Sequence, residues 1–188
     1  MAYPILRVLV MGLFGVAVLT SCAVTGKYKP VDNLATLDVT FVDPIWTGKI
    51  IPEGQQCQRF GGQGATPRLH VKNIPAGANT LILEYSDRDS TNVMDHGGHG
   101  VMGYRIAENT SEVIVPSVPG HTFDLPENFY LISAQARPDW DAAGAYMPPC
   151  SGGKGNWYEV TIKAVYDAKE TTDTSKLLGQ ANVGLGSY

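Results

Sequence analysis

Three acidic residues and two histidines gather in a short stretch that follows the most apolar strand-like segment of the chain. They are Asp87, Asp89, Asp95, His96 and His99, and they fall within 13 consecutive residues. Carboxylates and imidazoles clustered at the end of a strand can exchange protons or bind a metal ion. The two histidines have a spacing that a metal accepts, but no third-ligand signature accompanies them, so we expect no metal site. A solvated acidic loop is the alternative interpretation.

A second stretch with unusual chemistry is YMPPCSGGKGNWY, residues 146–158. It combines Pro148 and Pro149 with a cysteine and three glycines, and a β-branched run follows directly. Prolines stiffen the backbone, and glycines allow backbone amides to approach a ligand. Neither this loop nor the glycine-rich segments 60–64 and 96–100 has the spacing of a nucleotide-binding loop, so each of them, taken singly, is predicted to be a turn.

The sequence carries no recognisable catalytic set. Ser151 follows a cysteine and precedes two glycines, which is not the motif of an activated serine nucleophile. We therefore predict a protein that is not an enzyme and needs no cofactor. A hydrolase that uses the Asp–His cluster is a less favoured alternative.

The first 22 residues resemble the export signal of a bacterial lipoprotein. Arg7 is followed by an apolar run of 12 residues, 8–19, and the run ends in LTSC with Cys22. Such a run is too short to cross a bilayer comfortably and is typical of a signal peptide. We expect a signal peptide over residues 1–21 and a lipidated, palmitate-bearing Cys22. A plain signal peptide, or a buried helix with a chance cysteine, is the alternative.

Lipidation would anchor the protein to the cell envelope through Cys22. Ala23 is not the aspartate that marks inner-membrane retention, so we expect the outer membrane, with the protein facing the periplasm. Residues 22–35 are predicted to be the lipidated N-terminus and a tether. The two remaining cysteines, Cys57 and Cys150, form an even pair in an oxidising compartment, and we expect a disulfide between them. Two buried free thiols are the alternative.

The composition indicates a single loop-rich β domain over residues 36–188. The chain has 21 glycines, 12 prolines and only 17% charged residues, which favours strands and turns over a helical bundle. Its net charge of −4 argues against nucleic acid as a partner. Alternating and β-branched runs predict strands at residues 36–42, 68–74, 80–86, 101–106, 111–118 and 158–166, whereas residues 174–181 favour a helix.

Three blocks of this sequence, in order, resemble the phosphatidylethanolamine-binding protein family, which has bacterial members. Residues 57–89 contain T-P-x-L and D-R-D, similar to the family's S-P-x-L and D-P-D elements. His99 resembles the family histidine that follows this loop, and residues 146–167 resemble the family's proline-glycine block. The resemblance covers roughly residues 57–167. It implies an all-β, Greek-key β-sandwich with few short helices.

In this family the D-x-D loop and the proline-glycine loop meet at one end of the sandwich and form a small anion pocket. The resemblance implies a pocket made of Asp87, Asp89, His99, Pro148, Pro149, Asn156 and Tyr158. The match departs from the family pattern in several places. Arg88 and Thr91 stand where the family's D-P-D-x-P element has prolines, Gly100 replaces a tryptophan and Asn156 replaces a histidine. An asparagine donates hydrogen bonds but cannot carry an imidazolium charge; Arg88 or Lys154 is a candidate for the missing positive charge.

The function implied is that of an envelope lipoprotein that binds a small anionic or phosphorylated ligand. A structural or interaction lipoprotein, with a vestigial pocket and an unidentified protein partner in the envelope, is the alternative. As the charge of the pocket rests on His99, we expect ligand binding to strengthen as the pH falls and the imidazole gains a proton.

Overall fold

The computed structural model describes residues 27–90, 93–170 and 173–188. The predicted signal peptide and the lipidation site at Cys22 lie outside the described residues. Within the described ranges the chain forms strands and one three-residue 3-10 helix. They are β1 (Lys29–Thr36), β2 (Asp38–Phe41), η1 (Gln58–Phe60), β3 (Leu69–Lys72), β4 (Thr80–Asp87), β5 (Gly100–Arg105), β6 (Glu112–Val115), β7 (Phe129–Ser133), β8 (Trp157–Tyr166) and β9 (Lys176–Ser187).

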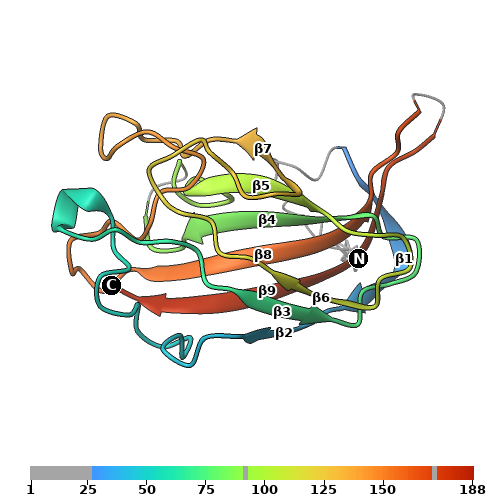
Figure 1. Ribbon diagram of the computed structural model, residues 1–188, viewed down its shortest axis with the longest axis horizontal. Coiled ribbons are helices and arrows are strands. Elements are labelled where there is room, and N and C mark those ends of the chain that lie inside the picture. Colours follow the sequence, from blue (N-terminus) through green and yellow to red (C-terminus); the bar gives the residue numbers. More distant parts are fainter. Residues whose placement is uncertain (1–26, 91–92, 171–172) are drawn as a thin grey trace, which may run out of the picture.

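Two sheets form a β-sandwich (Figure 1). The larger has six strands in the order β1-β9-β8-β4-β5-β7, and the smaller has three in the order β2-β3-β6. Neighbouring strands pair antiparallel except β1 and β9, which run parallel. The expected all-β sandwich with little helix is confirmed. No helix in the described ranges is both long enough and apolar enough to cross a bilayer.

Strand β4 lies at the centre of the large sheet, as its sequence predicts. Leu81, Leu83 and Tyr85 belong to the main core cluster, together with Leu69 and Val71 of the small sheet. Burying one such aliphatic side chain stabilises the fold by about 1.5–3 kcal/mol. The alternate residues of β4 are also buried, so this strand has no solvated face. That explains why its sequence is richer in apolar residues than the other strands.

The opposite face of β4 carries a buried ion pair. Glu84 accepts a hydrogen bond from the Lys163 ammonium at 2.6 Å, and both side chains are about nine-tenths buried. Beside this pair, Ile82 packs in a second apolar cluster that includes Tyr28 and Val165. The outer face of the sheet therefore mixes a small apolar cluster with a closely matched pair of charges.

Two predictions about secondary structure are wrong. Residues 174–181, expected to be helical, lie mostly in β9, which pairs along β8 from end to end. This long-range pairing overrides a weak local helical preference. Residues 29–35, expected to be part of a tether, lie in β1, an edge strand paired with β9. Strand β1 was missed because most of its side chains are exposed or half-buried and show no apolar alternation.

The two ends of the sandwich carry different features. At one end, Asp87 of β4 pairs with Tyr158 of β8, and Trp157 pairs with Ser187 near the C-terminus. At the other end, Lys29 pairs with Lys176 at the start of β9. Figure 1 shows the C-terminus and the loop before β8 at one end of the long axis, with β1 toward the other. The loops that carry the candidate site therefore lie far from the start of β1.

Candidate functional site

The two loops singled out in the sequence meet at one end of the large sheet. Asp87 ends β4 directly opposite Tyr158 in β8, and the His99 amide donates to the Tyr85 carbonyl at 3.0 Å. A cavity of about 210 Å³ lies between these loops. Its lining residues are Asp87, Ser90, Met94, His99, Arg137, Trp140, Met147, Cys150, Ser151, Lys154 and Asn156.

The Asp87 carboxylate is held by neighbours that donate hydrogen bonds to it. The Asn156 side-chain amide donates to both carboxylate oxygens, at 3.1 and 2.8 Å. The backbone amide of Asp89 donates to Oδ1 at 3.1 Å. Asn156 therefore fixes the orientation of Asp87. The asparagine that replaces a family histidine acts here by positioning a carboxylate.

His99 lines the cavity as a buried and neutral imidazole. Its Nδ1 lies 2.7 Å from the Met147 carbonyl oxygen, and because a carbonyl only accepts, Nδ1 carries the proton and Nε2 keeps its lone pair. The ring packs edge-on against Tyr158, with 5.2 Å between ring centroids. Burial lowers the pKa of His99 below 6.5, although the hydrogen bond to Met147 and the charge of Asp87 oppose that shift.

Two glycines bring His99 into this position. A Cβ built at Gly98 would overlap the backbone of Val93 and Met94, and one built at Gly100 would overlap the Ala145 carbonyl oxygen. Gly100 also has φ +125°, a backbone conformation that disfavours residues with a side chain. The absence of the family's tryptophan at position 100 follows from this close approach, because no side chain fits there.

Four of the seven residues expected in the pocket lie beside the cavity and do not line it. Asp89 turns away, and its Oδ2 accepts a hydrogen bond from the Trp157 amide at 2.7 Å. The Tyr158 hydroxyl accepts from the Cys150 amide at 3.0 Å, and burial raises the pKa of this tyrosine. Pro148 and Pro149 fall between two lining residues, Met147 and Cys150. The three that line the cavity are Asp87, His99 and Asn156.

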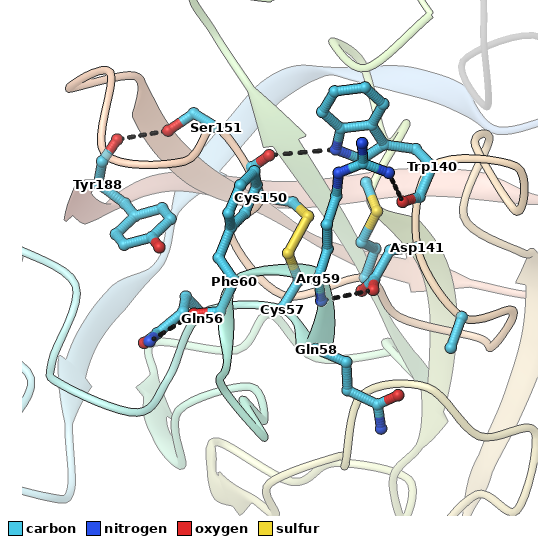
Figure 2. The surroundings of a disulfide bond; sticks show 12 residues. Gln56, Cys57, Gln58, Arg59, Phe60, Trp140, Asp141, Cys150, Ser151 and Tyr188 are labelled. Atoms are coloured by element: carbon cyan, nitrogen blue, oxygen red, sulfur yellow. Dashed lines mark hydrogen bonds between the residues drawn. A yellow bond between two sulfur atoms is a disulfide. The ribbon is translucent and has the colours of Figure 1, made fainter.

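The expected disulfide between Cys57 and Cys150 is present and forms part of the cavity wall. Figure 2 shows its surroundings. The Arg59 guanidinium lies over the Trp140 ring, 3.9 Å from its centroid, and donates to the Trp140 carbonyl at 2.9 Å. The Trp140 indole in turn donates to the Cys150 carbonyl at 3.2 Å. The disulfide and this stack together attach the proline-glycine loop to the segment around η1.

Positive charge reaches the cavity from two residues. Lys154 lines it on an exposed turn and has no salt-bridge partner among the residues that the structure describes. Arg137 also lines it but is paired with Asp139 at 3.0 Å. Arg88, the other candidate from the sequence, pairs with Asp95 at 2.6 Å and does not line the cavity. Lys154 is therefore the better placed of the two candidates.

Several lining residues could not be recognised from the sequence. Arg137 and Trp140 come from a loop without a motif and precede the proline-glycine loop by nine and six residues, whereas Met94 and Met147 lie in the two loops already singled out but match no ligand-binding motif. The hydrogen bonds of Trp140 with Arg59 and with the Cys150 carbonyl attach its loop to η1 and to the proline-glycine loop. Met147 lies in the proline-glycine loop, but nothing in the sequence distinguishes it from a core methionine.

Comparison with solved structures supports the fold. The crystal structure of YbcL from E. coli, described as a new member of the mammalian phosphatidylethanolamine-binding protein family, is 18% identical over 82% of this chain and 98% of that chain, with a TM-score of 0.53. The crystal structure of CT736 from Chlamydia trachomatis, described as a homologue of phosphatidylethanolamine-binding protein, is 19% identical over 81% of this chain and 97% of that one, with a TM-score of 0.48. No family model and no curated protein matches the sequence.

Proposed function

Because this chain has the fold of the phosphatidylethanolamine-binding protein family, we propose that it is a non-enzymatic binding protein of the bacterial envelope. Its ligand is a small phosphorylated molecule held in the cavity between β4 and the proline-glycine loop. One observation carries the proposal: the cavity brings Asp87, His99 and Asn156 together with the unpaired cation of Lys154.

The cavity offers groups of two kinds to such a ligand. Lys154 and the partly neutralised Arg137 attract a phosphate. On the β4 side, the Asp87 carboxylate and the Nε2 atom of His99 accept hydrogen bonds. A ligand such as phosphoethanolamine, which joins a phosphate to an ammonium group, satisfies both sets. Inorganic phosphate satisfies only the cations and lies near a carboxylate that repels it.

The size of the cavity supports a headgroup-sized ligand. Its volume of about 210 Å³ is below the roughly 300–1,000 Å³ of pockets for drug-sized molecules. A whole phospholipid with its acyl chains would extend far outside it. We therefore propose recognition of the polar phosphorylated group alone.

The position of the cavity in the fold predicts which way the cavity would face in a membrane-anchored protein. If Cys22 is lipidated, the membrane lies beyond the start of β1, which pairs with the first residue of β9. The cavity lies at the far end of β9, which has 12 residues, or roughly 36 Å at about 3 Å per residue. An anchored protein would thus hold its cavity away from its own membrane, facing the periplasm. Cys22→Ala, followed by membrane fractionation, tests the anchor.

The ligand proposal is tested by calorimetric titration of phosphoethanolamine and of inorganic phosphate. We expect phosphoethanolamine to bind more tightly and Lys154→Gln to weaken both ligands at least fivefold. Lys169→Gln, an exposed lysine beyond β8 and outside the cavity lining, is the matched control and should change neither. Absence of binding by the unmodified protein, or equal losses in both variants, would favour the alternative of an interaction protein with a vestigial pocket.

A further inference from the structure

The cavity gathers three soft or borderline metal donors, and of these the proposed phosphorylated ligand uses only the imidazole. Met94, Met147 and His99 all line it. Met94 and Met147 are buried and belong to one small cluster with Cys57 and Cys150. Both cysteines are bonded to each other in the disulfide and offer no thiolate. The soft or borderline metal donors that remain at this wall are therefore two thioether sulfurs and one imidazole nitrogen.

Backbone contacts hold these three residues next to one another. The Met147 amide donates to the His99 carbonyl at 2.9 Å, and His99 Nδ1 donates back to the Met147 carbonyl at 2.7 Å. Gly98, the residue before His99, lies so close to Met94 that a Cβ there would overlap the Met94 Cα. His99 is therefore hydrogen-bonded to Met147, and its chain neighbour Gly98 is in contact with Met94.

The tautomer of His99 suits a metal ligand. Because Nδ1–H is committed to a backbone carbonyl, the lone pair is on Nε2. A metal-binding histidine typically donates its other ring N–H to a carbonyl or carboxylate, which fixes both the tautomer and the ring orientation. Here the carbonyl oxygen that accepts this hydrogen bond belongs to Met147, one of the two methionines that would also bind the ion.

The donor types select the metal. Thioether sulfur is a neutral, soft ligand that favours Cu(I), whereas Mg²⁺, Ca²⁺ and Mn²⁺ favour carboxylate and water oxygens. Among the residues that the structure describes, Asp87 is the one carboxylate that lines the cavity, and it already accepts hydrogen bonds from Asn156. We propose that Met94, Met147 and His99 form a binding site for a soft monovalent metal ion, Cu(I), in the wall of this cavity.

The test uses Ag(I), which mimics Cu(I) without redox chemistry and leaves the disulfide oxidised. The full chain with Cys22→Ala, which removes the cysteine outside the disulfide, is labelled at its methionine methyl groups with carbon-13 and titrated with silver nitrate in chloride-free buffer. We expect one equivalent to shift the methyl signals of Met94 and Met147. Met102, which is fully buried in the main core and does not line the cavity, should not shift and serves as the internal control.

Affinity is then measured by competition with a Cu(I) chelator under ascorbate, in protein shown to contain no free thiol. Met94→Leu and Met147→Leu keep the side-chain volume and should each weaken binding at least tenfold, while Met102→Leu should leave it unchanged. Tight binding retained by the Met94→Leu and Met147→Leu double variant, or binding that appears only with free thiols, would overturn the site. Titration of the unmodified protein with phosphoethanolamine tests the proposed function without metal, so this inference and the proposed function can fail separately.

Discussion

Removal of the disulfide is the perturbation whose effect can be worked out most fully from the structure. Cys57 and Cys150 are separated by 93 residues, and both are buried. Replacing both with alanine removes the cross-link without introducing a buried polar group. The double variant is preferable to either single one, because a single change leaves a free thiol beside the cavity.

The expected magnitude follows from the entropy of the unfolded chain. The disulfide joins two residues that are 93 positions apart. In the chain-entropy model it lowers the entropy of the unfolded chain by about 16 cal/mol/K, which stabilises the fold by about 4.7 kcal/mol at 25 °C. For a chain of this size, such a loss corresponds to a fall of roughly 10–18 °C in Tm. The urea m-value should rise, because the unfolded chain without its cross-link exposes more surface.

The assay is urea unfolding followed by tryptophan fluorescence, with the oxidised protein, its reduced form and the double alanine variant measured side by side. We expect the last two to agree within about 1 kcal/mol, since both lack the same cross-link. Cys150 also lines the cavity, so binding of phosphoethanolamine should weaken in parallel. A loss of stability below ~2 kcal/mol, or two alkylatable cysteines in denatured but unreduced protein, would refute this reasoning.

Three further predictions concern single contacts. Glu84→Gln or Lys163→Met leaves one member of the buried ion pair without its partner and should lower the free energy of unfolding, measured in urea, by about 3–5 kcal/mol. The double variant with Glu84→Leu and Lys163→Met should lose less stability than either single variant. An additive loss would contradict the pairing. Burial lowers the pKa of His99 below 6.5 in the folded protein, so on acidification the unfolded chain takes up this proton first, and stability is lost as the pH falls below 6.5. His99→Gln should flatten this part of the curve of stability against pH. An unchanged slope would show that folding does not lower the pKa of this ring. Gly100→Ala places a Cβ against the Ala145 carbonyl oxygen at φ +125° and should cost at least ~1 kcal/mol. Gly153→Ala, which has open space around its Cβ and φ +76°, is the control and should cost less.

The effect of pH on ligand binding differs from the expectation drawn from the sequence. Seen as a motif, His99 was expected to charge and strengthen anion binding on mild acidification. In the structure its ring is buried, and its pKa is shifted below 6.5. Protonation at Nε2 therefore requires more acid than an ordinary histidine needs. We expect phosphoethanolamine affinity to change little through His99 between pH 8 and pH 7, which titration at fixed ionic strength would check.

The sequence predicted the fold best where local pattern and long-range pairing agree. Strand β4 is rich in apolar residues because both of its faces are buried, and β8 follows a loop that its prolines and glycines mark. Strand β9 and strand β1 could not be predicted in the same way. Their identity depends on pairing with each other and with β8, and neither carries a strict alternation of apolar and polar residues.

The candidate site was predictable only in part. Asp87, His99 and Asn156 follow from the order of the sequence blocks, because the ends of β4 and β8 are adjacent once these strands pair. Arg137, Trp140 and the two methionines enter the cavity through loop packing around the disulfide, which no local pattern encodes. Asp89 illustrates the opposite case: its residue type suits a pocket, but its carboxylate accepts a hydrogen bond from the Trp157 amide and does not line the cavity.

The central claim is that a small phosphorylated ligand occupies the cavity between β4 and the proline-glycine loop. The most direct measurement is an NMR titration of the labelled protein with phosphoethanolamine, following the backbone amides, the Asn156 side-chain amide and the His99 ring. We expect saturable shifts at Asn156, His99 and Lys154, with little change at the opposite end around β1. Shifts confined to residues outside the cavity, or no saturable shift at millimolar ligand, would contradict it.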